Sequence, residues 1–461
     1  MEKFNRIVFV SFFIAIFKHK IMKKKIKENK MLVDEINHYL KQLFSINRSI
    51  TGPGNRETLN ILQEISPLEI KEYPSGQAVY DWVIPDEWQV RNAWIKDGEG
   101  QKLVDFNLNN IHLVGYSEKV NKKMDFEELK SHLYYIDELP EAIPYRTSYY
   151  KREWGFCVTK AQYDLIEKTK GLFEIYIDSE FDSQGSLSIG ELLIPGKLEE
   201  EILISTYICH PSLANDNLSG MVMTSFLARE LLKQDNLKYS YRIIWVPETI
   251  GAIVYCANNE LQMKKINSGF VVTTVGGPGS LGYKQSFDTN HSLNSIVEAV
   301  FKEEELEYIK YPFDIHGSDE RQYSSQSFRI NTVSICKDKY YEYLFYHTSL
   351  DNLQYISAES ILESLNIYLK VLSKIDHERI YRSRYNHCEV MLSKHNLYPQ
   401  IGGSFLNENG EYTQLDLILW ILFWVNEHSS LRSLACHLNI EYTMLERVAE
   451  MLVEKEILEY V

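Results

Sequence analysis

The second half of the chain alternates short apolar runs with amphipathic segments. The apolar runs have the length of strands and lie at 191–195, 201–207, 242–247, 270–275 and 332–336. Segments with helical periodicity separate them, for example over 218–233 and 292–305. Apolar strands separated by helices predict an α/β fold with a largely parallel sheet, both of whose faces are covered by helices. Ligands in such sheets bind beyond the carboxyl ends of the strands, so the same pattern predicts where a site lies.

The rest of the chain has a different composition and a different hydrophobic pattern. Residues 31–75 read as two helices followed by a strand at 68–73, and the next hundred residues are rich in Trp, Tyr and Pro with short β-like runs. The C-terminal part contains three helical segments at 415–426, 430–438 and 442–456. Their spacing is that of a helix–turn–helix and predicts a winged-helix-like module.

The charge of the chain argues against binding to nucleic acid. The chain has 49 Lys and Arg against 64 Asp and Glu, a net charge of −15. Residues 1–30 hold nine Lys or Arg and two Glu, a charge of +7, so the remaining 431 residues carry −22. Residues 411–461 hold nine acids and three bases, where a DNA-binding face would need Lys and Arg. We therefore interpret the C-terminal module as a packing or protein-contact unit.

The basic head at 1–30 contains the eleven-residue apolar run Ile7–Phe17. A bilayer requires about 20 apolar residues, so this run is too short to span it, and no small-residue cleavage site follows. We favour a translation start at Met22 or Met31 over a membrane-surface anchor. The six cysteines are scattered without a CxxC pair, which indicates a reducing compartment, and we expect a cytoplasmic protein.

Candidate metal ligands and a candidate base follow two of the predicted strands. His210 and Asp216 come directly after the strand at 201–207, and imidazole and carboxylate are ligands that Zn²⁺ accepts when a water must stay bound. The alternative makes Asp216 a helix cap and His210 a loop residue. Glu248 emerges from the strand at 242–247, where desolvation would raise its pKa toward that of a general base, unless it is simply an exposed strand-end residue.

Two later segments add further polar side chains. Asp319, Glu320, Arg321 and Tyr323 lie together in the segment HGSDERQY, which reads as either a salt-bridge network or a substrate pocket. In YHTSLDNL, His347 is a candidate ligand, and Asp351 could orient its second ring nitrogen unless the two form a helix-surface pair. None of these features decides the matter alone, but all of them follow strands of one sheet.

In this order the motifs resemble those of the zinc-dependent exopeptidase superfamily, which has the aminopeptidase-like fold. The whole chain is more closely similar to bacterial polysaccharide-biosynthesis proteins with an aminopeptidase-like domain, on the segments RSITGPGNRETL, YDWVIPDEW, IPYRTSYY, WGFC, CHPSLANDNLSG, PETIGAI, GSDERQY and YHTSLDNL. The resemblance implies an aminopeptidase-like domain made of 31–75 and 180–385. It also implies an inserted small β-rich domain at 76–179 and a winged helix at 386–461.

The resemblance also implies roles for single residues. His210 and His347 match metal ligands, Asp216 matches the carboxylate that can bridge two metals, and Glu248 matches the general base. Three positions depart from the superfamily, because carboxylates often found there are replaced by Ser212, Thr249 and Thr273. Either one zinc is held by His210, Asp216 and His347, or Asp319 and Glu320 complete a second site.

We therefore expect a zinc-dependent hydrolase of the aminopeptidase type that cleaves an amide bond with Glu248 as base. Arg321 or Tyr323 would contact the substrate, which we expect to be a small peptide, an aminoacyl group or an acylamino sugar. The alternative is a degenerate peptidase fold that serves as a binding or scaffold protein, and Thr249 and Thr273 favour it. In either case the C-terminal module could recruit a protein partner or a second copy of the chain.

Overall fold

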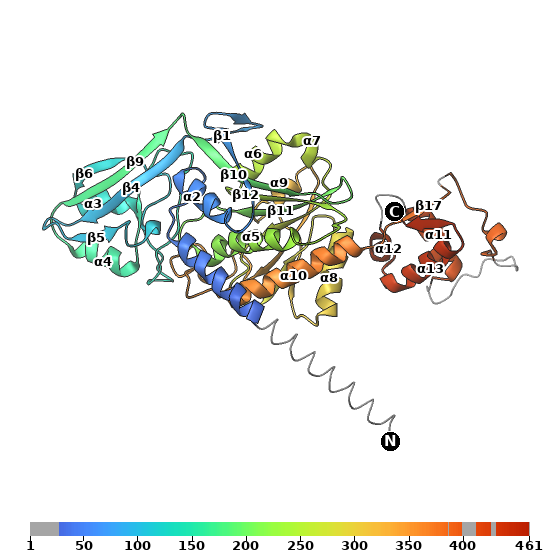
Figure 1. The fold of residues 1–461 in the computed structure, drawn as a ribbon. Helices are drawn as coiled ribbons and strands as arrows, with labels where there is room; N and C mark the ends of the chain where they lie inside the picture. Colours follow the sequence, from blue (N-terminus) through green and yellow to red (C-terminus); the bar gives the residue numbers. More distant parts are fainter. Residues whose placement is uncertain (1–26, 386, 399–411, 426–429, 461) are drawn as a thin grey trace, which may run out of the picture.

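The computed structural model describes residues 27–385, 387–398, 412–425 and 430–460. Most of the predicted basic head at 1–30 therefore lies outside the described residues. A mixed eight-stranded sheet forms the centre (Figure 1), in the order β1 (Glu69–Pro74), β10 (Ser186–Ile194), β12 (Ser240–Val246), β11 (Glu201–Tyr207), β13 (Ser268–Val272), β16 (Asn331–Lys337), β14 (Leu281–Lys284) and β15 (Ile309–Tyr311).

The four central strands β12, β11, β13 and β16 run parallel, as the strand–helix alternation predicts. The outer strands differ, because β10 pairs antiparallel with both β1 and β12, and β14 pairs antiparallel with β16. The predicted strand at 191–195 is therefore part of an antiparallel strand. β10 follows β9 (Phe173–Asp182) of a second sheet. It leads into β11 without a crossover helix, so β11 and its parallel neighbour β12 run opposite to β10.

Helices cover both faces of the sheet, which confirms the predicted fold class. Every residue of β11 and β12 is buried, and along β11 Ile202 and Ile204 join one hydrophobic cluster while Leu203 joins the other. The first cluster includes the helix over 27–44, α2 (Pro53–Leu62), α5 (Gly220–Leu231), α8 (Ser292–Glu303) and α10 (Ala358–His377). The second includes α6 (Ile250–Asn258), α7 (Glu260–Met263) and α9 (Glu320–Tyr323).

Between β1 and β10 the chain forms a second, smaller sheet at one end of the molecule (Figure 1). Its antiparallel strands lie in the order β5 (Lys102–Asp105), β4 (Glu87–Lys96), β9 and β6 (Val120–Met124). Shorter elements accompany it, namely the strand pairs β2 (Ala78–Val79) with β3 (Trp82–Val83) and β7 (Leu133–Tyr134) with β8 (Phe156–Cys157), and the helices α3 (Phe126–Leu129) and α4 (Lys160–Lys168). We call residues 76–182 the inserted region.

The C-terminal part lies at the opposite end of the molecule (Figure 1). Its helices α11 (Gln414–Trp424), α12 (Leu431–Leu438) and α13 (Tyr442–Glu454) lie at the three predicted positions, and β17 (Tyr381–Ser383) pairs antiparallel with β18 (Leu458–Tyr460). The Arg432 guanidinium, 2.7 Å from Glu378, links α12 to the end of α10. The winged-helix assignment stays a prediction. Among the described residues, no helix has the length and apolar character needed to cross a membrane.

Candidate active site

Polar side chains gather beyond the carboxyl ends of the central strands, where the sheet predicts a site. His210 and Asp216 lie in the segment that joins β11 to α5, and Glu248 lies two residues after β12. His347 comes from the long connection between β16 and α10. Thus three residues that follow the parallel strands β11 and β12 lie close to His347, which is distant from them in sequence.

His210, Asp216 and His347 form a compact group of potential ligands. Each offers one nitrogen or oxygen, and these three atoms lie within 4.8 Å of one another. Asp216 Oδ2 is 3.0 Å from His347 Nε2, and neither atom has another partner among the described residues. Two buried ligand atoms that meet each other and no further protein group can both bind one cation. Two imidazoles and a carboxylate are a donor set of catalytic zinc sites.

The electrostatics keep His210 and Asp216 in the states that bind metals. Burial lowers the pKa of His210 to about 4, so its imidazole is neutral near pH 7. Burial acts to raise the pKa of Asp216, but His210 and His347 outweigh it and hold that pKa below its ordinary value. The Tyr207 hydroxyl donates to Asp216 Oδ1 and lies 2.6 Å from Thr273 Oγ1. The carboxylate is thus held on Oδ1 by Tyr207, and its Oδ2 faces His347.

Glu248 faces this group. Its Oε2 lies 3.7 Å from His210 Nε2, and the side chain is 28% exposed at the edge of the site. Although part of it reaches solvent, the surrounding protein and the charge of Asp216 raise the pKa of Glu248 to about 7. A carboxylate with such a pKa can accept and return a proton near neutral pH.

Cys209 joins a second group of potential ligands with His210 and Glu248, again within 4.8 Å. Its Sγ accepts a hydrogen bond from the Glu248 backbone N–H at 3.3 Å. Burial raises the pKa of the Cys209 thiol well above its ordinary value, so the thiolate that metals bind is disfavoured. The group of His210, Asp216 and His347 is therefore the better cation site.

Asp351 does not make the predicted hydrogen bond to His347. Its carboxylate accepts the backbone N–H groups of Asn215 at 2.7 Å and Asp216 at 3.0 Å, and the Tyr343 hydroxyl at 2.9 Å. The prediction was wrong because the chain turns after His347 and brings Asp351 beneath the loop that follows β11. Asp351 therefore fixes the backbone of Asp216.

Asp319 and Glu320 each have one carboxylate oxygen bound by protein donors, and their part in a second metal site stays a prediction. Neither belongs to a group of converging ligand atoms in the described part of the chain. Asp319 Oδ1 accepts the Thr249 N–H at 2.7 Å, because Asp319 packs against the start of α6. Glu320 begins α9 and points toward β16, where it accepts hydrogen bonds from Ser334 and Tyr340, both at 2.8 Å.

The two predicted substrate contacts differ in position. Tyr323 is completely buried, and its hydroxyl lies 2.8 Å from Ser205 Oγ inside the core. Its position on the inner side of α9 explains why the prediction of a substrate contact was wrong. Arg321 is exposed on the same short helix, and its role stays a prediction.

Two residues near the site had no assigned role in the sequence analysis. Arg48 is 1% exposed, and its Nε donates to the backbone oxygen of His210 at 3.0 Å. Tyr145, from the inserted region, places its ring 5.3 Å from that of His210 and 5.2 Å from that of His347. Both residues lie in segments that carry the family resemblance, RSITGPGN and IPYRTSYY, which was the only signal for them.

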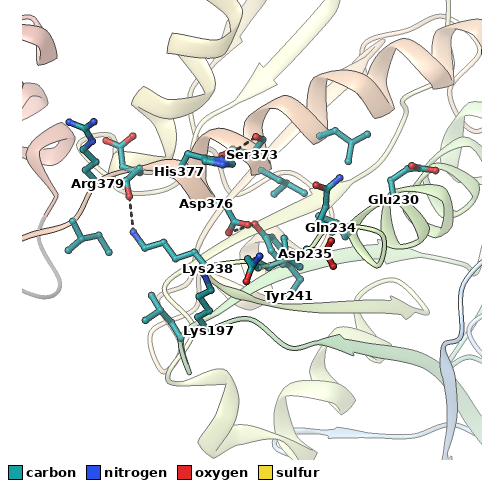
Figure 2. Close-up of a pocket in the computed structure, with 18 of the residues that line it drawn as sticks. Lys197, Glu230, Gln234, Asp235, Lys238, Tyr241, Ser373, Asp376, His377 and Arg379 are labelled. Carbon is teal, nitrogen blue, oxygen red and sulfur yellow. Dashed lines mark hydrogen bonds between the residues drawn. The ribbon is translucent and has the colours of Figure 1, made fainter. Parts of the chain in front are cut away.

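A separate cavity of about 960 Å³ opens at the opposite edge of the sheet. Figure 2 shows Lys238 and Tyr241, at the amino end of β12, facing the end of α10 across it. Lys238 donates to the backbone oxygen of Glu378 at 2.7 Å, and Tyr241 donates to Asp376 at 2.9 Å. None of the candidate ligands lines this cavity, so the cavity is not part of the candidate active site.

Comparison with known proteins identifies the family. A family profile described as a domain of unknown function, DUF4910, matches residues 37–378. The chain belongs to the DUF4910 family.

Known proteins similar to this DUF4910 chain support the aminopeptidase-like fold. A Clostridium acetobutylicum protein named as a polysaccharide biosynthesis protein with an aminopeptidase-like domain is 39% identical over 427 residues, which cover 93% of this chain and 96% of the relative. A solved structure described as a peptidase from C. acetobutylicum is 37% identical, with a TM-score of 0.77, and the match covers 96% of this chain and all of that one. These matches confirm the resemblance inferred from the motifs.

The fold extends to more distant enzymes. The zinc aminopeptidase BSAP from Bacillus subtilis is 11% identical with a TM-score of 0.54, and the match covers 74% of this chain and 94% of BSAP. At such low sequence identity, the similarity of the DUF4910 chain to BSAP is a similarity of fold alone.

Proposed function

We propose that this protein is a zinc-dependent hydrolase of the aminopeptidase type that cleaves an amide bond. The observation that carries the proposal is the convergence of Asp216 Oδ2 and His347 Nε2 at 3.0 Å, with no other partner for either atom among the described residues, beside His210. Glu248, 3.7 Å from His210, stands next to this group with a pKa raised by burial to about 7. A metal site and an adjacent base are the two parts that metal-assisted hydrolysis needs.

In this mechanism His210, Asp216 and His347 would hold the ion. Zinc bound there would supply Lewis-acid chemistry, which polarises a carbonyl and makes a water easier to deprotonate. Glu248 takes a proton from the water that attacks the amide carbon and returns it to the leaving nitrogen. Tyr207 and Asp351 keep the Asp216 carboxylate and its backbone in place.

We propose one zinc ion rather than two. Thr273, which stands where a carboxylate is often found in the superfamily, is buried and pairs with Tyr207. The Thr249 N–H is bound to Asp319, and Glu320 points toward β16. Three protein ligands and one open position are sufficient for a catalytic zinc.

The substrate we propose is a small peptide, an aminoacyl group or an acylamino sugar. The last of these is favoured by the name of the C. acetobutylicum relative, which links that protein to polysaccharide biosynthesis. A cytoplasmic location, no binding to nucleic acid and self-association or partner binding through the C-terminal module remain part of this proposal. The competing scaffold function, favoured by Thr249 and Thr273, predicts neither stoichiometric zinc nor hydrolysis.

Purified protein would be tested against a panel of aminoacyl-arylamides, short peptides and N-acylated amino sugars after supplementation with zinc. The proposal predicts hydrolysis of at least one class, and its loss after removal of the metal with a chelator. Hydrolysis that persists in protein free of metal would contradict it. Protein that binds no stoichiometric zinc and hydrolyses no member of the panel would favour the scaffold function.

A further inference from the structure

We infer that the inserted region positions the metal ligand His347, so that zinc binding depends on residues 143–145. This inference rests on the proposed zinc site and extends it to a segment outside the sheet that carries the other two ligands. It concerns Tyr145 and Ser349 as positioning residues, since neither offers a ligand atom to the candidate group.

The two segments are joined by a short antiparallel ladder. The Tyr145 backbone N–H donates to the backbone oxygen of His347 at 2.8 Å. Two residues further on, the Ser349 N–H donates to the backbone oxygen of Ile143 at 2.9 Å, and the Ile143 N–H donates to the Ser349 hydroxyl at 2.9 Å. Pro144 and Thr348 form the bridge between these contacts. Three hydrogen bonds therefore fix the backbone on both sides of Thr348.

His347 needs this support because its ring lacks the usual outer partner. A ligating histidine generally donates its second ring N–H to a carboxylate, a carbonyl or a water. Among the described residues the His347 ring makes one polar contact, that of Nε2 with Asp216 Oδ2 at 3.0 Å, and Asp351 binds the backbone of Asn215 and Asp216 instead. His347 also has a φ of 54°, in the left-handed region that few side chains favour.

Packing between two tyrosines sets the direction of the ring instead. Tyr346 stacks on the His347 ring with centroids 3.9 Å apart and planes inclined by 13°. Tyr145 meets the same ring at 5.2 Å and 89°, and meets the His210 ring at 5.3 Å. The Tyr145 ring therefore packs against both imidazoles of the candidate site, and its backbone N–H binds the backbone oxygen of His347.

The inserted region holds this segment firmly. Gly115 donates to the backbone oxygen of Arg146, and the Ser148 N–H donates to the oxygen of Gly115, both at 2.9 Å. The Tyr145 hydroxyl lies 3.2 Å from that of Tyr149, whose ring packs on Tyr116 in the hydrophobic core of this region. A displacement of the inserted region would thus be transmitted to His347.

The test compares zinc affinity, by competition with a coloured chelator, in the full-length protein and in single variants. Tyr145→Ala removes the ring, and Ser349→Ala removes one hydroxyl of the ladder. Each should weaken zinc binding by about 10- to 100-fold, the usual effect of losing a side chain that orients a metal ligand. Tyr145→Phe and Ser349→Thr keep the ring and the hydroxyl and should restore the affinity. Tyr150→Ala, an exposed neighbour in the same segment, is the matched control.

The visible spectrum of the cobalt-loaded protein separates positioning from general destabilisation. At saturating cobalt the spectra of Tyr145→Ala and Ser349→Ala should differ from that of the wild type, because His347 coordinates in another orientation. Wild-type affinity and spectrum in both variants would overturn the inference alone. A wild-type protein that binds no zinc would overturn the proposed function as well. Ser349→Ala, which deletes a single oxygen, keeps the test decisive if Tyr145→Ala does not fold.

Discussion

Asp216 Oδ2 lies 3.0 Å from His347 Nε2, and neither atom has any other partner in the described part of the chain. Asp216 follows the central strand β11, whereas His347 is brought to it by the long connection after β16. Two buried ligand atoms at this distance, together with His210, can bind one cation. The account of this protein depends on that cation being a zinc ion.

Replacing either of these residues should weaken zinc binding. Asp216→Asn and His347→Ala each change one of three ligands. We therefore expect zinc affinity to fall by more than about 100-fold, which is the largest usual effect of replacing a residue that only orients a ligand. Chelator competition measures the affinity. His377→Ala, an exposed histidine on α10, serves as the control and should bind zinc like the wild type. Unchanged affinity in both site variants would place the metal elsewhere.

Glu248→Gln should separate chemistry from metal binding. The amide keeps the size of the side chain but cannot take a proton, so we expect hydrolysis to fall by about 10²- to 10⁴-fold. Zinc content should stay at the wild-type level, since Glu248 is not in the group of His210, Asp216 and His347. Glu342→Gln, a change at an exposed glutamate, should leave both quantities unaltered. Full hydrolytic activity in Glu248→Gln would refute its role as the base.

Local patterns in the sequence were sufficient to predict the site residues that directly follow the strands. The apolar run at 201–207 is β11 residue for residue, and His210, Asp216 and Glu248 lie beyond strand ends as predicted. Position along a strand is encoded locally by hydrophobic runs, so it can be read without knowledge of the fold.

The directions of loop side chains could not be predicted in this way. Glu320 and Tyr323 lie on a single turn of helix, and only the packing of that turn decides that both face inward. Asp351 caps a backbone that is distant in sequence. Tyr145 was missed for the same reason, because its contacts with His210 and His347 exist only after the inserted region has docked.

Tyr323→Phe tests the corrected position of this residue. The change removes a hydroxyl that lies 2.8 Å from Ser205 Oγ in the core, so unfolding in urea should show a loss of about 1–2 kcal/mol. Zinc affinity and the KM for substrate should not change, whereas a substrate-binding role would raise KM. Tyr150→Phe, at a half-exposed position, should alter the free energy of unfolding by less than about 0.5 kcal/mol.

Acid should weaken the junction between the two sheets. Arg56 on α2 contacts Glu87 on β4 through two hydrogen bonds of 2.6 and 2.5 Å, and Glu87 also accepts the Ser186 N–H at 2.9 Å. Burial acts to raise the pKa of Glu87, but these donors outweigh it and lower that pKa below its value in the unfolded chain. The stabilisation is therefore present above the unfolded pKa, about 4.3, and is lost as the pH falls through the folded value.

Glu87→Gln checks this dependence. At pH 7 the variant should lose about 1–3 kcal/mol of unfolding free energy, because hydrogen bonds to a charged group are replaced by weaker ones. Its stability should fall less than that of the wild type between pH 6 and about pH 3. Parallel pH curves for the two proteins would show that Glu87 does not contribute.

The zinc content of the full-length protein tests the central claim most directly. After supplementation with zinc and removal of loosely bound metal, inductively coupled plasma mass spectrometry should find about one zinc per chain, as three protein ligands predict. A content below about 0.2 zinc per chain is too low to be explained by partial occupancy of a catalytic site. Such a result would contradict the metal site and with it the proposed hydrolase.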